Sequence, residues 1–232
     1  MNAEDPAVMT IPSAASEPLV AGHGTGQPAV TIAGGGDVPR LACALADAFV
    51  NDPVYRWMLP ASVRLKARLR VMFTGEMEQY GMPQGDAWTN GGRDGAVVAL
   101  PPGAWEMPKS LTLTQALMWA RAFGRRLPRA ASVQRAMEER HIREPHFYVR
   151  LIGVRPSLQG RGLGSALMQP TLQRADSAGV ATYIEASTRR SAALYERLGF
   201  QHTGVLELPD GGPPLWLMRR PAAGSAHQTP GG

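Results

Sequence analysis

The chain has 232 residues, of which 44% are hydrophobic, and these values suit one domain with a sizeable core and flexible ends. No run approaches the roughly 18 consecutive apolar residues of a membrane helix, and the first 36 residues lack Lys, Arg and any apolar block, so we expect no membrane span and no secretory signal. The single cysteine, Cys43, excludes an intrachain disulfide framework and indicates a reducing, cytoplasmic location. It lies between two alanines of an amphipathic pattern, and we interpret it as a buried structural thiol.

The net charge is +5, and almost all of the positive charge comes from Arg. Such a balance can favour anionic partners, and the densest Arg region runs from Arg121 to Arg143. Acidic residues interrupt this region, and no nucleic-acid-binding motif accompanies it. We therefore expect a solvated helical face and no nucleic-acid partner.

In chain order, residues 1–27 are rich in small and polar residues and read as a disordered tail, as do residues 221–232. A strand at 28–33 precedes a helix that Asp37 is placed to cap and that Asn51-Asp52-Pro53 stops. A second helix is predicted at about 62–80. Two short strands at 86–89 and 95–100 flank the hairpin turn Asn90-Gly91-Gly92, and helical patterns fill about 110–142.

The second half predicts strand 147–154, a glycine loop, helix 162–178 and strand 181–187. Helix 190–198 and strands from Phe200 and near Leu215–Met218 follow. Strand, helix and strand at this spacing indicate a parallel pair with a crossover helix inside an α/β sheet.

Three alternating glycines, Gly160, Gly162 and Gly164, stand where the strand passes into the helix. Glycine lets a ligand approach the backbone closely, and the unpaired amides of a helix N-terminus attract anions such as a diphosphate. A P-loop is excluded because the region has no Lys, and a dinucleotide fingerprint would need Gly where Ser165 stands. A helix capped by glycines for packing alone is the remaining alternative.

The run GVRPSLQGRGLGSALMQP, with Gln159, Gly162 and Gly164, resembles the cofactor motif of the GNAT superfamily of N-acetyltransferases. The run ALYERLGFQHTG, with Tyr195 before Gly199-Phe200, resembles the second signature of that superfamily. From about Glu144 to Pro221 the chain is also similar to the puromycin N-acetyltransferases in particular.

The resemblance implies a GNAT domain at 28–220, with a mixed, mostly antiparallel sheet of about six to seven strands flanked by helices. Its central parallel strands, 147–154 and 181–187, would splay to admit the pantetheine arm of acetyl-CoA. It implies that Tyr195 protonates the departing thiolate and that a backbone amide near Val154 binds the oxyanion. The cofactor would be held by Val154, Gln159, Gly160, Arg161, Gly162, Leu163, Gly164 and Ser165. Many members carry Asn where this chain has Thr188.

A general base is less evident. Glu185 shares one strand face with Tyr183 and Ser187, and a partly desolvated carboxylate there is a usable base or amine anchor. Two alternatives stay open: Glu185 pairs with Arg150 of the neighbouring strand, or a water chain removes the proton.

For the acceptor, Asp52 is a candidate to attract a cationic amine and Trp57 a candidate apolar wall, although each can equally be a cap or a core residue. His141, His146 and His202 show no metal-ligand spacing, so we expect no metal. The predicted activity is transfer of acetyl from acetyl-CoA to a primary amine of a small molecule, antibiotic-like or nucleoside-like, by a monomer or homodimer. The alternatives are acetylation of a protein N-terminus or lysine, and a non-catalytic acetyl-CoA sensor.

Overall fold

The computed structural model describes residues 28–59, 64–84, 86–106 and 112–223. The predicted tail at 1–27 and residues 224–232 lie outside this part of the chain. A seven-stranded sheet runs through the domain in the order β1-β2-β3-β4-β5-β7-β6. Its strands are β1 Val30–Ile32, β2 Ala87–Asn90, β3 Gly95–Leu100, β4 His146–Val154, β5 Ala181–Ala186, β6 Gln201–Leu206 and β7 Leu215–Arg220.

The predicted helices form close to their expected positions. The described helices are α1 Val38–Phe49, α2 Pro53–Met58, α3 Leu65–Glu76, α4 Met82–Gln84, α5 Leu113–Phe123, α6 Leu127–Arg140, α7 Leu163–Ser177 and α8 Arg189–Arg197. A π-helical segment, Met77–Gly81, joins α3 to α4. Asn51-Asp52-Pro53 stops α1 as predicted, but Pro53 also begins α2, a short helix that the pattern did not predict.

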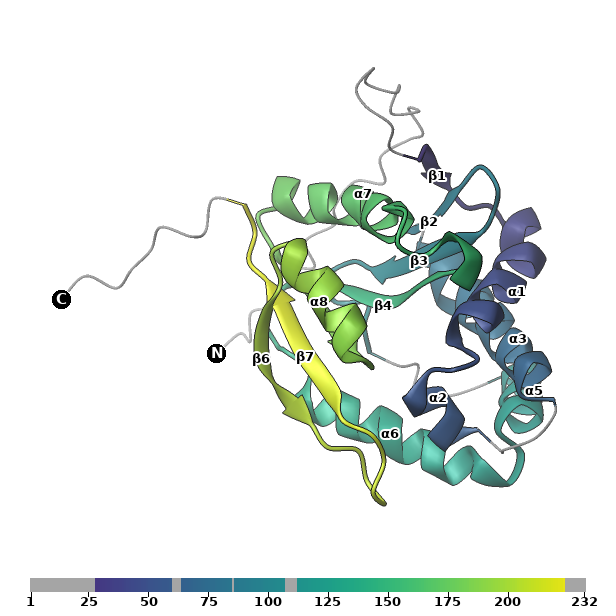
Figure 1. Cartoon of the computed structure of the whole chain (residues 1–232). Helices are drawn as coiled ribbons and strands as arrows, with labels where there is room; N and C mark the ends of the chain where they lie inside the picture. The colour runs from purple at the N-terminus through teal and green to yellow at the C-terminus, as the bar shows by residue number, and fades with distance from the viewer. Residues whose placement is uncertain (1–27, 60–63, 85, 107–111, 224–232) are drawn as a thin grey trace, which may run out of the picture.

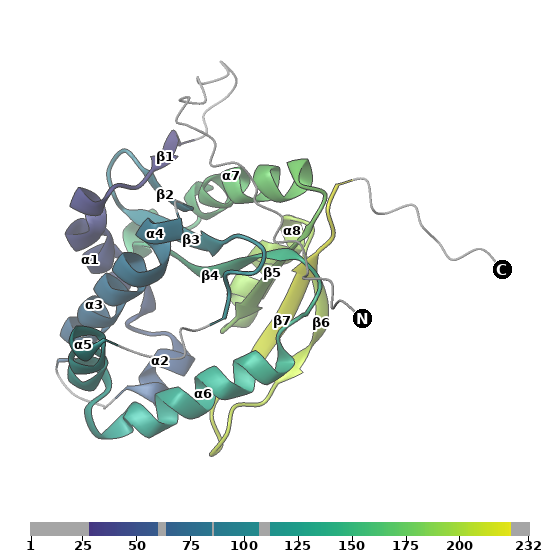
Figure 2. The same cartoon turned by 180° about the vertical axis from the view of Figure 1, so that it is seen from behind.

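The helices cover both faces of the sheet. Figures 1 and 2 show α7 and α8 on one face, with α1, α3, α5 and α6 on the other. Along each strand, successive side chains point to opposite faces of the sheet. Tyr148 and Tyr183 join the larger core under α1, α3 and α6, and Val149 and Ile184 join the smaller core under α7 and α8.

The parallel pair sits at the centre of the sheet and opens along its length. β4 and β5, linked by α7, pair from His146 with Ala181 to Tyr148 with Tyr183 and no further. β4 nevertheless stays paired with β3 as far as Val154, and β5 stays paired with β7 as far as Ala186. The two strands therefore splay apart beyond Tyr148 and Tyr183. The other strand pairs are antiparallel, so the predicted mixed sheet with a splayed centre is confirmed.

Two local expectations are wrong. Asp37 does not cap α1 with its side chain. It accepts the amide of Gly34 at 3.0 Å and the Arg93 guanidinium at 2.8 Å, and so closes the turn before the helix. Cys43 is half-buried and not buried, with Arg70 Nη1 lying 3.9 Å from its sulfur.

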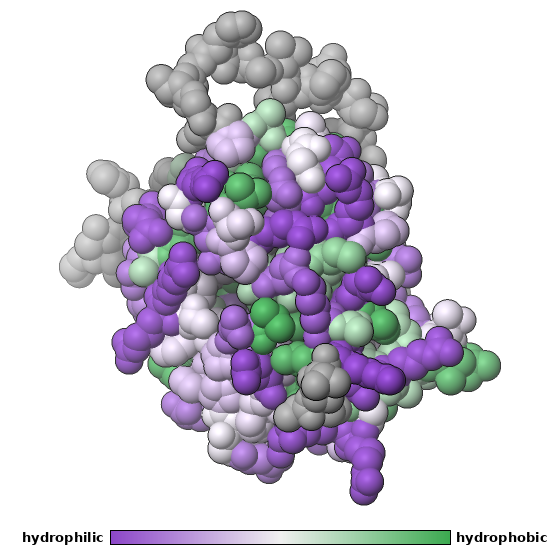
Figure 3. Space-filling model, turned by 45° about the vertical axis from the view of Figure 1, so that its right-hand side comes forward, coloured by the Kyte–Doolittle hydropathy of each residue, from purple (hydrophilic) through white to green (hydrophobic). Residues whose placement is uncertain are grey.

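The described surface carries its apolar side chains singly or in small groups. The large exposed ones are Ile32, Val71, Leu113, Leu117, Leu127 and Val205. Figure 3 shows one side of the molecule, where apolar spots are separated by polar residues. Within the described ranges, every helix is too short or too polar to cross a bilayer.

Candidate active site

The splay leaves one edge of each central strand open. Among the described strands, β4 has only β3 beside it between Val149 and Val154, and β5 past Tyr183 has only β7. Peptide groups along a strand point alternately to its two sides, so part of each strand's backbone donors and acceptors faces the gap. An extended chain with its own amides can pair with such edges.

The loop after β4 is held in place by the signature Gln. Gln159 Nε2 donates to the carbonyl oxygen of Val154 at 2.9 Å, so this side chain fastens the loop to the end of its own strand. Gly160 and Gly162 have φ of +79° and +82°, a left-handed conformation that favours glycine. A Cβ at either position would find open space, so backbone conformation, and not packing, selects glycine there.

The N-terminus of α7 presents its amides outward. The first backbone bond into the helix is Ala166 N to Gly162 O at 2.9 Å. Among the described residues, nothing accepts the amides of Leu163, Gly164 or Ser165, and the first turn holds no acid. Arg161 is exposed beside them. Free amides, a helix dipole and a guanidinium suit a diphosphate, so these residues fit the cofactor that the sequence implies.

Tyr195 lies on α8, buried beside the second signature. Its ring centroid is 5.9 Å from that of Phe200, and the amide of Phe200 donates to the Tyr195 carbonyl at 3.0 Å. Burial, and after it the negative charge of Asp52, raises the pKa of the Tyr195 phenol above its ordinary value. The hydroxyl makes no hydrogen bond with the described residues. It is therefore a neutral group with its proton available for donation.

The side chain of Asp52 is the N-cap of α2. Its Oδ1 accepts the amides of Val54 at 2.9 Å and Tyr55 at 3.1 Å at the start of α2. Its Oδ2 accepts a hydrogen bond from the Ser187 hydroxyl, just past β5. Both carboxylate oxygens are engaged, so Asp52 ties α2 to the end of β5, next to Tyr195. Its use as an anchor for an amine stays a prediction.

Thr188, which stands where the sequence resemblance leads us to expect Asn, caps α8. Its hydroxyl accepts the amide of Ser191 at 3.1 Å, and the Ser191 hydroxyl bonds back to the Thr188 carbonyl at 2.8 Å. Threonine is a good N-cap, so the departure from the signature leaves the helix start intact.

Glu185 is buried beneath the gap. Its side chain is 4% exposed, and Oε1 lies 3.7 Å from Nδ1 of His141. The interpretation that Glu185 pairs with Arg150 is wrong. Arg150 binds both carboxylate oxygens of Glu76 on α3, at 2.5 and 3.1 Å. The reason is the splay, because β5 has left β4 by Arg150 and α3 lies beneath it instead.

The sequence did not predict a contact between His141 and His146. Their Nε2 atoms are 2.9 Å apart, and His146 Nδ1 lies 2.7 Å from the carbonyl oxygen of Glu144. Trp105 stacks on His141 with ring centroids 4.0 Å apart. The turn between α6 and β4 brings the two imidazoles together, and no pattern in the sequence predicts this contact. Over the described ranges, no group of three or more His, Cys, Asp or Glu side chains is arranged to hold a metal ion.

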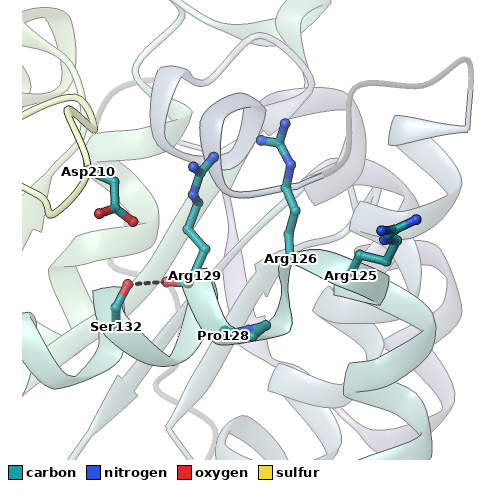
Figure 4. A pocket seen from close by; sticks show the side chains of 6 residues that line it. All are labelled: Arg125, Arg126, Pro128, Arg129, Ser132 and Asp210. Carbon is teal, nitrogen blue, oxygen red and sulfur yellow. Dashed lines mark hydrogen bonds between the residues drawn. The ribbon is translucent and has the colours of Figure 1, made fainter.

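Trp57 packs at the far end of α2. The Arg129 guanidinium lies 4.5 Å from its ring centroid, and its carbonyl accepts Arg126 at 2.6 Å. Arg126, Arg129 and Asp210 line a cavity of about 360 Å³. Figure 4 shows the two arginine side chains side by side and pointing the same way, with Asp210 on the other side of Arg129 from Arg126. The other lining residues are Arg125, Pro128 and Ser132. Most arginines of the Arg-rich region are exposed, as expected, while Arg126 and Arg129 are half-buried.

The model of the acetyltransferase (GNAT) family matches residues 116–200, which hold β4, the glycine loop and Tyr195. Among curated proteins, the mycothiol acetyltransferases of Streptomyces avermitilis and Streptomyces coelicolor are each 40% identical over 63 residues. That segment is 26% of this chain and 20% of each of those proteins, so the chain matches about a fifth of their length.

Solved structures share the whole fold. One from Corynebacterium glutamicum, described as histone acetyltransferase HPA2 and related acetyltransferase, is 25% identical with a TM-score of 0.62 over 84% of this chain and 97% of that one. A polyamine N-acetyltransferase of Drosophila melanogaster is 20% identical with a TM-score of 0.56 over 84% of this chain and all of that one (100%). The fold is therefore that of these acetyltransferases. The family model thus matches the segment that holds both sequence signatures, and the fold is shared with solved acetyltransferases.

Proposed function

We propose that this protein is an acetyl-CoA-dependent N-acetyltransferase that acts on a primary amine of a small molecule. One observation supports the proposal. The loop Arg155–Gly162 has the outward amides at the start of α7 on one side and the open strand edges beyond Tyr148 and Tyr183 on the other. Tyr195 belongs to α8, which packs beside that helix start, since a Cβ on Gly164 would touch Leu194 at 3.4 Å.

In the proposed complex, amides of Leu163, Gly164 and Ser165 bind the diphosphate, and the gap receives the pantetheine arm. The bound acetyl-CoA supplies a thioester as acetyl donor. A β4 amide near Val154 stabilises the oxyanion. Tyr195 donates its proton to the departing thiolate, and its raised pKa keeps that proton in place at neutral pH.

The acceptor class follows from the charge on the other side of the gap. Glu185 is a buried carboxylate there, and Asp52 stands close enough to act on Tyr195 electrostatically. Both favour a cationic amine over an anionic acceptor. The polyamine enzyme named above contributes the shared fold alone to this proposal, and the closer kinship with puromycin N-acetyltransferases rests on the sequence resemblance.

The direct test is transfer of acetyl from acetyl-CoA to a panel of amines, followed by thiol release. The panel should contain a polyamine, an aminonucleoside, a lysine-containing peptide and a peptide with a free N-terminus. We expect turnover with a small amine. Turnover with a peptide alone would favour the protein-acetylating alternative, while tight cofactor binding with no turnover on any amine would favour a sensor.

Cofactor binding is tested separately with Gly164→Glu and its neutral match Gly164→Gln. A carboxylate in the first turn of α7 is favourable for the helix dipole, so the fold should persist while the anion site is filled. We expect the affinity for coenzyme A in calorimetry to fall by at least about tenfold in the Glu variant, from the lost charge-assisted bonds, and by less in the Gln variant. Equal affinity in all three proteins would place the diphosphate elsewhere.

A further inference from the structure

A buried line of polar groups leads away from Glu185 on the acceptor side of the gap. The Glu185 and His141 side chains are 4% and 3% exposed, with Oε1 and Nδ1 3.7 Å apart. His141 Nε2 lies 2.9 Å from His146 Nε2, and His146 Nδ1 lies 2.7 Å from the Glu144 carbonyl oxygen. The line thus joins a carboxylate to two imidazoles and ends on a backbone carbonyl.

The end of the line fixes the direction of every hydrogen bond in it. A carbonyl oxygen can only accept, so Nδ1 of His146 carries a hydrogen. Burial lowers the pKa of His146 below its ordinary value, which keeps the ring neutral and leaves a lone pair on Nε2. His141 Nε2 must then donate to it. The Nδ1 atom of His141 is left without a hydrogen unless the ring takes up a second proton, and this atom faces Glu185.

In that arrangement, one proton can be held at the contact between Glu185 Oε1 and His141 Nδ1. With none, the Nδ1 lone pair would face an ionised carboxylate, which is unfavourable in a buried place. Glu185 Oε1 is also buried and has no well-aligned hydrogen bond among the described residues, although the Tyr148 and Tyr183 hydroxyls lie close enough to interact with its carboxylate. Native proteins keep few buried polar atoms without a good hydrogen bond, because each one is costly. A group that takes up a proton during the reaction is a reason to keep one.

Among the residues that the structure describes, no other buried carboxylate lies next to His141. Tyr183 from β5 and Tyr148 from β4 have their rings 4.8 and 4.7 Å from it, and burial, followed by the Glu185 charge, raises the pKa of both phenols, so they stay neutral. On the chain around His141, Arg140 and Arg143 are exposed. Glu144 is held by Arg219.

Building on the proposed function, we infer that Glu185 accepts a proton from the acceptor ammonium and shares it with His141, while His146 holds His141 in the tautomer that can receive it. The N–H bond of the ammonium breaks, its electron pair stays on nitrogen, and an O–H bond forms on Glu185. Oε1 and Nδ1, 3.7 Å apart in this structure, must first approach to hydrogen-bond distance. The proton then moves to Nδ1 of His141, which becomes an imidazolium beside the Glu185 carboxylate. Glu185 is the group that meets the substrate, and His141 and His146 are positioning residues.

The tautomers can be read directly in the full-length protein without any substrate, from imidazole ¹⁵N shifts of histidine-labelled protein. We expect His146 with hydrogen on Nδ1 and a bare Nε2, and His141 with hydrogen on Nε2 and Nδ1 protonated only when the pair holds its proton. His202, exposed and 2.7 Å from Glu196, is an internal reference for a surface pair. A His146 ring with hydrogen on Nε2 alone would overturn the inference, whether or not the protein acetylates amines.

Kinetics test the role with His141→Phe, which keeps a ring to stack on Trp105. We expect kcat to fall about 10²-fold, in the range of a lost proton transfer, with KM for acetyl-CoA unchanged and the acidic limb of the pH profile displaced. His146→Leu should have a smaller effect, and none when added to His141→Phe, because it acts only through that ring. His202→Phe is the matched control and should keep the wild-type profile.

The outcomes separate the two proposals. A wild-type protein that acetylates amines while His141→Phe, folded by near-UV circular dichroism, keeps its rate and pH profile removes the shared proton but not the activity. A wild-type protein that acetylates no amine removes the proposed function, and the ¹⁵N result still decides whether the pair exists.

Discussion

The phenol of Tyr195 combines two properties that rarely coincide. It is buried against Phe200, and yet its hydroxyl is not used by the described residues for a hydrogen bond. Burial and the nearby charge of Asp52 both disfavour the phenolate. The residue is thus suited to give a proton and unsuited to act as a base.

Replacing the hydroxyl tests this residue most sharply. We expect Tyr195→Phe to lower kcat about 10²-fold through loss of the acid, with the Kd for coenzyme A unchanged because the ring still fills its place. The raised pKa predicts that the wild-type rate does not fall through loss of this proton as the pH rises to about 10, the ordinary pKa of a phenol. Steady-state kinetics from pH 6 to 10 with calorimetry check both points, and equal rates in the two proteins would remove Tyr195 from the reaction.

Among the elements, α2 depends most on one side chain. This helix has six residues, too few to be stable alone, and Asp52 both caps it and receives the Ser187 hydroxyl from the end of β5. The cap therefore also fixes where α2 lies against the splayed strands.

Truncating this cap should loosen the acceptor side of the gap. We expect Asp52→Ala to lower the free energy of unfolding by about 1–2 kcal/mol, as for other lost caps, with a further cost from the unpaired Ser187 hydroxyl. Asp52→Asn keeps an oxygen for the two amides and should lose less. Urea unfolding measures both, and an Ala variant as stable as wild type would mean that packing alone holds α2.

At the scale of the molecule, the point where β4 and β5 part decides which buried charged groups pair on the face of the sheet that α3 and α6 cover. Arg150 meets Glu76 on α3 because β5 is no longer beside it. His141 reaches Glu185 because α6 ends beneath β5. The opening between β4 and β5 thus decides which charges neutralise each other.

The buried imidazole of His146 makes global stability depend on pH. Burial lowers the folded-state pKa of His146, so the unfolded chain binds a proton at higher pH than the folded one does. The free energy of unfolding should therefore hold its full His146 contribution above about pH 6.5, the ordinary pKa of histidine, and lose it as pH falls below that value. The slope approaches about 1.4 kcal/mol per pH unit.

Urea titrations at pH 8 to 5.5 on wild type and His146→Leu check this contribution. The difference between the proteins isolates His146, because Asp52 and Asp86, whose pKa burial raises, add the opposite slope to both. Parallel curves would show that His146 is protonated as readily in the folded protein as in the unfolded one.

The sequence by itself determined the order of strands and most helices, the glycine loop and the place of Tyr195, because local periodicity, turn chemistry and two spaced signatures record them. It did not determine α2, because a helix of six residues that begins at Pro53 is too short to show a helical pattern of apolar residues. The tertiary structure alone decided the partners of the buried charges. Glu76 and Arg150 are 74 residues apart and Asp52 and Ser187 are 135 apart, and a contact across such a distance follows from how the strands splay and the helices pack, which no local pattern encodes.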